Sequence, residues 1–310
     1  MQKNKMLEWL LLLTVFIWGM NTPIMKVGLI YISPVLYNAI RLLIAAMLAW
    51  PILWYSRTYK PVQKNDIIPI LAIGLCGFFF CQLFLAIGLP KTTAGNASLM
   101  MALLPLNVVI MNRIFKNEKM TFPMAVGMVV SLTGAILVIL GSGKEINLTS
   151  NHLIGTLCVF IAQIGNAYYT IFSRDLLARY STYQITTYVL TVSAIAFGIL
   201  AMPDLLTVSW RAIPFSAWAS ISYSALFALL FCNIVWVWVI GKLGSTRASL
   251  YQNLIPIFSI IGGWFFLGEV MGWLQCAGTV IIFIGLYISR IKVNKDLITK
   301  SERIVCSDSK

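Results

Sequence analysis

Runs of about 20 mostly apolar residues recur along the chain, and this recurrence limits the fold more than any other feature of the sequence. A run of that length crosses the hydrocarbon core of a bilayer as one α-helix. Ten spans are predicted: Leu7–Lys26, Pro34–Tyr55, Ile67–Leu89, Thr93–Asn112, Thr121–Leu140, Leu153–Ser173, Gln184–Met202, Phe215–Ile240, Thr246–Leu267 and Met271–Ser289. The sequence therefore predicts an all-α membrane protein of ten transmembrane helices.

Composition and charge placement agree with a membrane protein and exclude nucleic acid as a partner. Hydrophobic residues make up 59% of the 310 residues and charged residues 11%, against about 45–50% and about 25% in soluble domains. The net charge of +13 comes from short basic clusters between the apolar runs, not from a continuous stripe. With the N-terminus inside, every second connection is basic. Both termini are therefore predicted to lie in the cytoplasm. The protein is predicted to reside in the cell membrane, the inner or plasma membrane of a bacterium.

The two halves of the chain align with each other when the sequence is shifted by 151 positions. Without a gap, the shift places Pro105 on Pro256, Glu118 on Glu269, Gly127 on Gly278 and Gly134 on Gly285. Each half holds five spans, an odd number, so the second half enters the membrane from the opposite side. The chain is therefore predicted to consist of two inverted five-helix repeats, 1–141 and 152–290, and a basic cytoplasmic tail, 291–310. Inverted repeats are typical of secondary transporters.

Two stretches carry a family resemblance: WGMNTPIMKVGL followed by SPVLYNAIRLLIA in the first half, and TRASLYQNLIPIFSIIGGWFFLGE in the second. With the ten spans and the two halves, they resemble the drug/metabolite transporter superfamily and, within it, the EamA-type permeases. The resemblance implies ten helices around a central cavity, cytoplasmic termini, and efflux of amino acids or related metabolites.

Polar side chains inside the spans recur at matching places in the two halves. Such side chains are costly in lipid and usually face a cavity or another helix. Their clustering predicts one substrate cavity lined by Trp18, Asn21, Gln82, Asn96, Ser98, Gln163, Asn166, Tyr168, Asn233, Trp236, Ser249, Tyr251, Gln252 and Asn253. For any one of them, a hydrogen bond between helices is the alternative role. The aromatic members suit amino acids through stacking and cation–π contacts.

Three of the prolines in the predicted spans, and the one arginine well inside a span, carry specific expectations. Pro23, Pro105 and Pro256 each remove one helical hydrogen bond, and we expect either a static kink for packing or a hinge for transport. Arg41 lies about 10 Å along its helix. It is expected either to pair with a backbone carbonyl or the lipid interface, or to be a counter-charge for a carboxylate-bearing substrate.

The acidic residues and the missing motifs narrow the function further. Glu118 and Glu269 precede the next spans, where a carboxylate complements a helix N-terminus. No Asp or Glu lies in the middle of a span, so proton coupling through a buried carboxylate is not expected. Catalytic residues, a metal cluster, a phosphate loop for ATP and other cofactor motifs are not found in the sequence, and an enzyme is not expected.

The sequence therefore predicts a secondary transporter of small metabolites in the lipid bilayer, foremost an amino-acid or metabolite exporter that works by alternating access. Two alternatives remain. One is a different cargo in the same superfamily, such as a drug or a nucleotide-linked metabolite. The other is a membrane scaffold that transports nothing.

Overall fold

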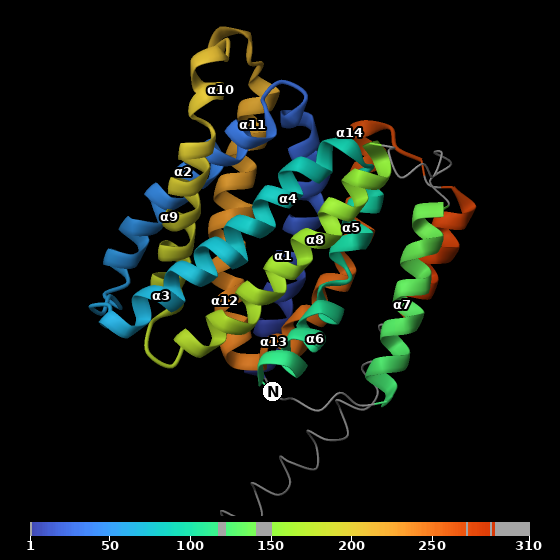
Figure 1. The fold of residues 1–310 in the computed structure, drawn as a ribbon, viewed down its shortest axis with the longest axis horizontal. Helices are drawn as coiled ribbons and strands as arrows, with labels where there is room; N and C mark the ends of the chain where they lie inside the picture. Colours follow the sequence, from blue (N-terminus) through green and yellow to red (C-terminus); the bar gives the residue numbers. More distant parts are fainter. Residues whose placement is uncertain (1, 117–121, 141–150, 271, 286, 289–310) are drawn as a thin grey trace, which may run out of the picture. The chain divides into compact units, whose positions relative to one another are not determined.

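The computed structural model describes residues 2–116, 122–140, 151–270, 272–285 and 287–288, which are mostly helical and contain no strand (Figure 1). Seven helices in this part of the chain are long and apolar enough to cross a membrane: Met6–Leu29, Pro34–Tyr55, Lys64–Lys91, Ala94–Lys116, Asn151–Leu176, Thr182–Leu200 and Phe215–Leu243. The other three predicted spans contain shorter apolar helices: Ala125–Gly134, Ile255–Leu267 and Trp273–Gly285. The prediction of an all-α membrane protein is confirmed for the described residues, and the count of ten spans stays a prediction.

The chain divides into two compact units. The larger unit comprises Met1–Met111 and Glu145–Val270, and the smaller comprises Asn112–Lys144 and Met271–Lys310. The helices of the larger unit are α1 (Gln2–Leu29), α2 (Pro34–Tyr55), α3 (Lys64–Ala72), α4 (Phe80–Gly88), α5 (Ala94–Met101), α8 (Asn151–Leu176), α9 (Thr182–Leu200), α10 (Met202–Thr207), α11 (Phe215–Tyr223), α12 (Cys232–Leu243), α13 (Ser245–Ser249) and α14 (Ile255–Leu267). α6 (Leu104–Lys116) begins in the larger unit and ends in the smaller, which also holds α7 (Phe122–Leu140).

Local sequence sets the ends of several helices. Ser33 caps α2 by accepting a hydrogen bond from a backbone N–H of the first turn, and Pro34 follows as the first helical residue. Thr93 and Ser181 cap α5 and α9 in the same way. These side chains satisfy N–H groups that a helix start leaves without a partner. Gly268 ends α14 with a φ of 64°, a left-handed conformation that favours glycine.

Irregular helical segments recur at equivalent positions of the two halves. A π-helix, η1 (Ile73–Phe79), interrupts the third span, and another, η4 (Ser224–Phe231), interrupts the eighth. Both halves also use short 3-10 segments, among them η2 (Leu89–Lys91), η3 (Trp210–Ala212) and η5 (Leu250–Leu254). The starts of η1 and η4, of α5 and α13, and of α6 and α14 are each 151 positions apart. The repeat seen in the sequence is therefore also present in the helix boundaries.

The structure corrects the placement of two prolines. Pro105 lies in the first turn of α6 and Pro256 in the first turn of α14, because the fourth and ninth spans are each broken into separate helices. A first-turn residue has no intrahelical acceptor for its N–H, so proline loses nothing there. Of the three prolines, only Pro23 lies inside a helix, α1.

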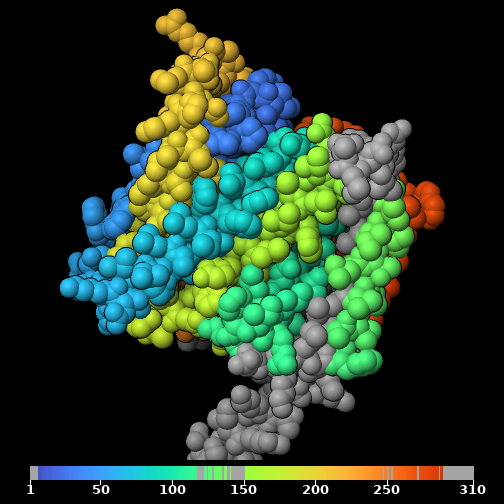
Figure 2. All heavy atoms as spheres, in the orientation of Figure 1, coloured from blue at the N-terminus to red at the C-terminus, as the bar shows by residue number. Residues whose placement is uncertain are grey.

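Glycine allows a close helix approach in the larger unit, where α8 lies along α4 and η1 (Figures 1 and 2). A Cβ atom on Gly165 of α8 would lie 2.7 Å from the carbonyl oxygen of Gly77 and 2.9 Å from the backbone nitrogen of Cys81. Both atoms belong to the backbone and cannot move aside cheaply. The packing of α8 therefore depends on the missing side chain.

We expect Gly165→Ala to lower the free energy of unfolding by about 1–3 kcal/mol, the usual cost of overpacking. Gly198→Ala is the matched control, because a Cβ on Gly198 would meet no atom within 4 Å. Removing that helical glycine should stabilise the protein by roughly 0.5–1 kcal/mol. Thermal unfolding of both purified variants measures the contrast, and equal shifts would contradict it.

The two helices of the smaller unit pack through the glycines that align between the two halves of the sequence. A Cβ atom on Gly134 of α7 would lie 2.7 Å from the carbonyl oxygen of Gly278. A Cβ atom on Gly285 would lie 2.6 Å from the carbonyl oxygen of Gly127. The paired small residues therefore bring the two backbones into contact, as such residues do between helices in membranes.

Candidate functional site

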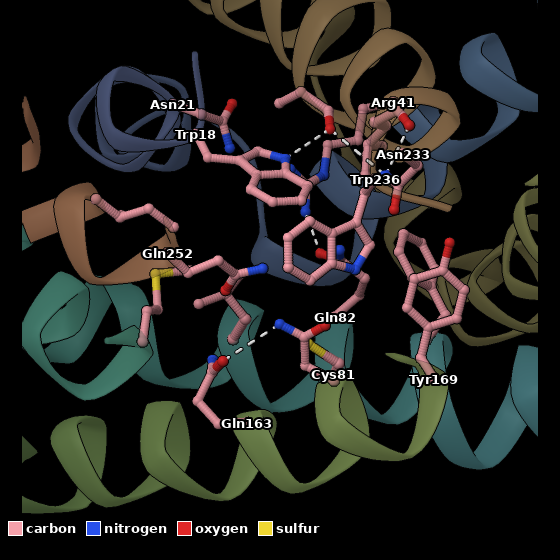
Figure 3. Close-up of a pocket in the computed structure, with 17 residues that line it drawn as sticks. Trp18, Asn21, Arg41, Cys81, Gln82, Gln163, Tyr169, Asn233, Trp236 and Gln252 are labelled. Carbon is pink, nitrogen blue, oxygen red and sulfur yellow. Dashed lines mark hydrogen bonds between the residues drawn. The ribbon is translucent and has the colours of Figure 1, made fainter. Parts of the chain in front are cut away.

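A polar cavity of about 80 Å³ lies within the larger unit, lined by 17 residues from α1, α2, η1, α4, α5, α8, η4, α12, η5 and α14 (Figure 3). Nine of the residues singled out from the sequence line it: Trp18, Asn21, Arg41, Gln82, Gln163, Asn166, Asn233, Trp236 and Gln252. Typical ligand pockets measure about 300–1,000 Å³. The cavity in this structure is therefore smaller than a typical ligand pocket.

Arg41 is the charged side chain of the cavity wall, and it is 1% exposed. Its Nε donates to Asn38 Oδ1 at 2.7 Å, and its Nη1 donates to Ser224 Oγ at 2.7 Å. Its Nη2 donates to Gln82 Oε1 at 2.6 Å, and the guanidinium lies 5.7 Å from the centre of the Tyr37 ring. The partners are side chains, not the backbone carbonyl or the lipid interface that the sequence suggested.

All of these Arg41 partners are neutral. No Asp or Glu lines the cavity among the residues that the structure describes. The three hydrogen bonds use three of the five N–H donors of the guanidinium. A buried cation in a spanning helix is costly, and here its charge is solvated by hydroxyl, amide and aromatic groups without being neutralised.

Four buried polar atoms on the cavity wall have no hydrogen-bond partner in the described part of the chain. They are the amide oxygen of Asn21, the amide nitrogen of Gln163, the hydroxyl of Tyr169 and the indole nitrogen of Trp236. A buried polar group without a partner costs about 1–3 kcal/mol. The cavity wall therefore presents two N–H donors, one oxygen acceptor and one hydroxyl to whatever enters it.

Aromatic rings hold the shape of this wall. The rings of Trp18 and Trp236 lie 5.4 Å apart at 66°, in edge-to-face contact, and Trp18 Nε1 donates to the carbonyl oxygen of Ala228 at 2.9 Å. The Trp18 ring is thereby fixed to η4. Phe78 and Tyr169 form a second edge-to-face pair at 5.2 Å.

The remaining residues predicted for the cavity are placed elsewhere: Asn96, Ser98, Tyr168, Ser249 and Tyr251 lie outside its lining, and the side chain of Asn253 lies outside the described residues. Ser98 and Ser249 each donate to the carbonyl three positions earlier, at 2.8 and 2.9 Å. Asn96 Nδ2 lies 3.4 Å from His152 Nε2. Their hydrogen bonds are thus local or structural.

Sequence reasoning chose Tyr168 and missed its neighbour. The Tyr168 ring packs on Phe172 with centroids 4.4 Å apart, whereas Tyr169 lies on the cavity wall (Figure 3). The apolar lining, which includes Phe78, Cys81 and Met101, was also missed. Nothing in the local sequence distinguishes these residues from other apolar residues in the spans.

Comparison with known proteins decides the family. The model of the EamA-like transporter family matches residues 5–140 and 153–291, one match in each half. The chain belongs to the EamA-like transporter family. The resemblance noted from the sequence is therefore confirmed, and the protein is a membrane transporter of this family.

Curated relatives of this EamA-like transporter match over most of their length. An uncharacterized transporter of Archaeoglobus fulgidus is 26% identical, covering 91% of this chain and 98% of the relative. The uncharacterized transporter YoaV of Bacillus subtilis is 25% identical, covering 88% and 92%. A probable terminal-alkyne amino-acid exporter of Streptantibioticus cattleyicolor is 26% identical, covering 90% and 92%.

A solved crystal structure shares the fold. Its chain is 16% identical to this EamA-like transporter, with a TM-score of 0.65, and the match covers 94% of this chain and 98% of that one. At this identity the likeness concerns the fold alone.

An ion pair joins α1 to the segment after α14 in this EamA-like transporter. Lys26 Nζ lies 2.8 Å from Glu269 Oε1 and also donates to the carbonyl oxygen of Thr92 at 2.7 Å. Glu269 Oε2 accepts from the N–H of Ala94, the first residue of α5, at 2.8 Å. The expectation that Glu269 complements a helix N-terminus is confirmed, but that helix is α5 and not the helix that follows. Glu118 lies outside the described residues.

A larger hollow of about 800 Å³ lies toward the N-terminal end of α1, and we call it the end groove. Its lining includes Leu10 of α1, Thr58, Leu177 at the end of α8, the start of α9, and residues of η4 and α12 as far as Lys242. Thr58 Oγ1 donates to Ser181 Oγ at 2.9 Å, so the connection after α2 is fastened to the start of α9 beside the groove.

Proposed function

We propose that this protein exports amino acids, or similar small metabolites that carry a carboxylate, as a secondary transporter in the cell membrane. The supporting observation is the cavity wall. Among the residues that the structure describes, Arg41 has no carboxylate partner there and four further polar atoms have no hydrogen-bond partner. These groups match the polar ends of an amino acid.

The cavity offers a carboxylate several donors. Arg41 has two N–H groups beyond its three hydrogen bonds, and Gln163 Nε2 and Trp236 Nε1 add two more. Hydrogen bonds between charged groups are short and strong. The amide oxygen of Asn21 is an acceptor for an amino group, and the Tyr169 hydroxyl serves either end. One cavity cation suits one carboxylate better than the several phosphate charges of a nucleotide-linked cargo.

Alternating access between two inverted five-helix repeats is the mechanism that we propose. The equivalent π-helices and helix breaks of the two halves support it, because one unit used twice gives two similar states. Pro105 and Pro256 stand at existing breaks, where a hinge needs no further loss of hydrogen bonds. The basic connections support ten spans with both termini in the cytoplasm. The cavity must widen to admit cargo, since about 80 Å³ is well below the roughly 300–1,000 Å³ of typical ligand pockets.

A flux assay tests the proposal. Proteoliposomes are loaded with labelled amino acids, one at a time, and a parallel set is loaded with nucleotide sugars. We expect efflux of at least one amino acid above that from protein-free liposomes, and resistance of cells expressing the protein to an excess of the same compound. Folded protein that moves nucleotide sugars but no carboxylate-bearing metabolite would overturn it.

Gln252→Leu should reduce transport by about 10- to 150-fold while the protein still inserts, because a lost hydrogen bond to a charged ligand is worth about 1.5–3 kcal/mol. Gln252 is 3% exposed and its side chain points into the cavity (Figure 3). Tyr251→Phe, next to it but outside the lining, is the matched control and should transport normally. Unchanged flux in Gln252→Leu proteoliposomes would remove this residue from the site.

A further inference from the structure

One face of α8 leads from the cavity to the end groove. Gln163 and Asn166 line the cavity, and Leu177 lines the groove. Thr170 and Ser173 occupy the positions between them on the same face, because spacings of three and four residues return to one side of an α-helix. These five residues form the α8 stripe. The four within α8, from Gln163 to Ser173, span about 15 Å, and Leu177 lies in the turn directly after the helix.

The two stripe residues between the cavity and the end groove are polar and fully buried, and their hydroxyls have no hydrogen-bond partner among the described residues. Thr170 and Ser173 are both 0% exposed, and in the described part of the chain neither hydroxyl has a hydrogen-bond partner. Buried hydroxyls in helices usually bond to a carbonyl one turn back, as Thr187 does to Tyr183 at 2.7 Å. Two adjacent buried hydroxyls without a bond are a cost that packing alone does not explain.

Helices α12 and α13 pack against α8 at the groove end of the stripe. A Cβ atom on Gly241 of α12 would lie 2.9 Å from Leu177 Cδ1, and Gly241 also lines the end groove. Thr186 of α9 lies one turn along from Thr182, which lines the groove, and its buried hydroxyl has no hydrogen-bond partner among the described residues. Buried hydroxyls with no hydrogen-bond partner in the described part of the chain therefore follow the groove-lining residues on both α8 and α9.

We propose that the α8 stripe lines the transport route between the cavity and the end groove. This route is closed in the present structure, because Thr170 and Ser173 are fully buried. Thr170 and Ser173 bond to water or to passing cargo when α12 and α13 move away from α8. This inference rests on the proposed function, because it names the route by which cargo would reach or leave the same cavity.

Thiol labelling tests the route without any assumption about cargo. Thr170→Cys and Ser173→Cys are made in a background whose six native cysteines are replaced by alanine, and the full chain in lipid nanodiscs is treated with a water-soluble, membrane-impermeant methanethiosulfonate. Lys242→Cys, exposed in the groove, is the positive control. Ser193→Cys is the negative control, because Ser193 is 0% exposed and its hydroxyl has a partner, the Gly74 carbonyl.

We expect both stripe cysteines to label completely, roughly 10- to 1,000-fold more slowly than Lys242→Cys, as for an open state populated at about 0.1–10%. Ser193→Cys should stay unlabelled over the same time. Stripe cysteines that label no faster than Ser193→Cys would overturn the route. Labelled stripe cysteines in a protein that moves no amino acid would instead keep the route and overturn the proposed cargo.

A second experiment keeps the proposal testable if the cysteine-free protein fails to fold. In the native sequence, Thr170→Val with Ser173→Ala removes both hydroxyls with little change in shape. We expect the maximal flux to fall by at least about tenfold with little change in the half-saturating concentration, since passage and not cavity binding is affected. Thr187→Val, equally buried at 1% but facing α2, should leave the flux unchanged. Wild-type flux in the double variant would overturn the role of the hydroxyls.

Discussion

Arg41→Gln should abolish the proposed preference of the transporter for cargo with a carboxylate. Truncating one partner of a buried charge pair costs about 2–5 kcal/mol, so the flux of a transported amino acid should fall at least about thirtyfold. We expect wild type to move the neutral amide of the same amino acid poorly, and Arg41→Gln to move it at the same rate as wild type. Flux of the acid and its amide through proteoliposomes measures this directly.

Two controls separate recognition from folding. Arg211→Gln removes an exposed arginine of η3 and should leave both fluxes unchanged. Arg41→Lys keeps the charge but loses the planar set of donors that Ser224 and Gln82 accept from, and it should recover part of the preference for the acid. An Arg41→Gln protein that folds and still prefers the acid as strongly as wild type would show that Arg41 serves the structure alone.

Glu269→Ala should lower the free energy of unfolding by about 2–4 kcal/mol. The carboxylate bonds both the Lys26 ammonium and the N–H of Ala94, so its loss removes an ion pair and a capping interaction that acts beside the Thr93 cap of α5. A charge-assisted hydrogen bond is worth about 1.5–3 kcal/mol and a helix cap typically about 1 kcal/mol. Chemical unfolding of the purified protein in detergent measures the loss.

A double-mutant cycle with Lys26→Met, Glu269→Gln and the pair of changes isolates the ion pair. We expect a coupling energy of about 0.5–3 kcal/mol, because the two side chains are in direct contact. The double variant should therefore be more stable than the sum of the two single losses predicts. Strictly additive losses would mean that the Lys26 and Glu269 charges do not act on each other.

The polar residues of the cavity were predictable where they interrupt apolar spans. Asn21, Gln163 and Asn233 stand out because an amide in lipid needs a partner or a cavity. The same signal also selected Ser98 and Ser249, whose hydroxyls bond within their own helical turns. A sequence shows that a side chain is polar, but not whether its own backbone already satisfies it.

The sequence could not predict how each helix is rotated about its own axis, and so which of its residues face the cavity. Tyr168 and Tyr169 differ by about 100° around α8, and the contact that fixes this rotation joins Gly165 to Gly77, which are far apart in the chain. The π-helices were equally hidden, because no residue in η1 or η4 marks a wider turn. The prolines did locate the breaks of the fourth and ninth spans, although separate helices replace the expected kinks.

The neutral surroundings of Arg41 have an electrical consequence. Moving one elementary charge through 100 mV is worth about 2.3 kcal/mol, and a carrier that holds an unneutralised cation at its centre takes that charge through part of the field as it reorients. A bound monoanion would cancel the charge, whereas a zwitterion would leave it in place. We therefore expect membrane voltage to drive the empty carrier and the carrier loaded with a zwitterion, and to have little effect on the carrier loaded with an anion.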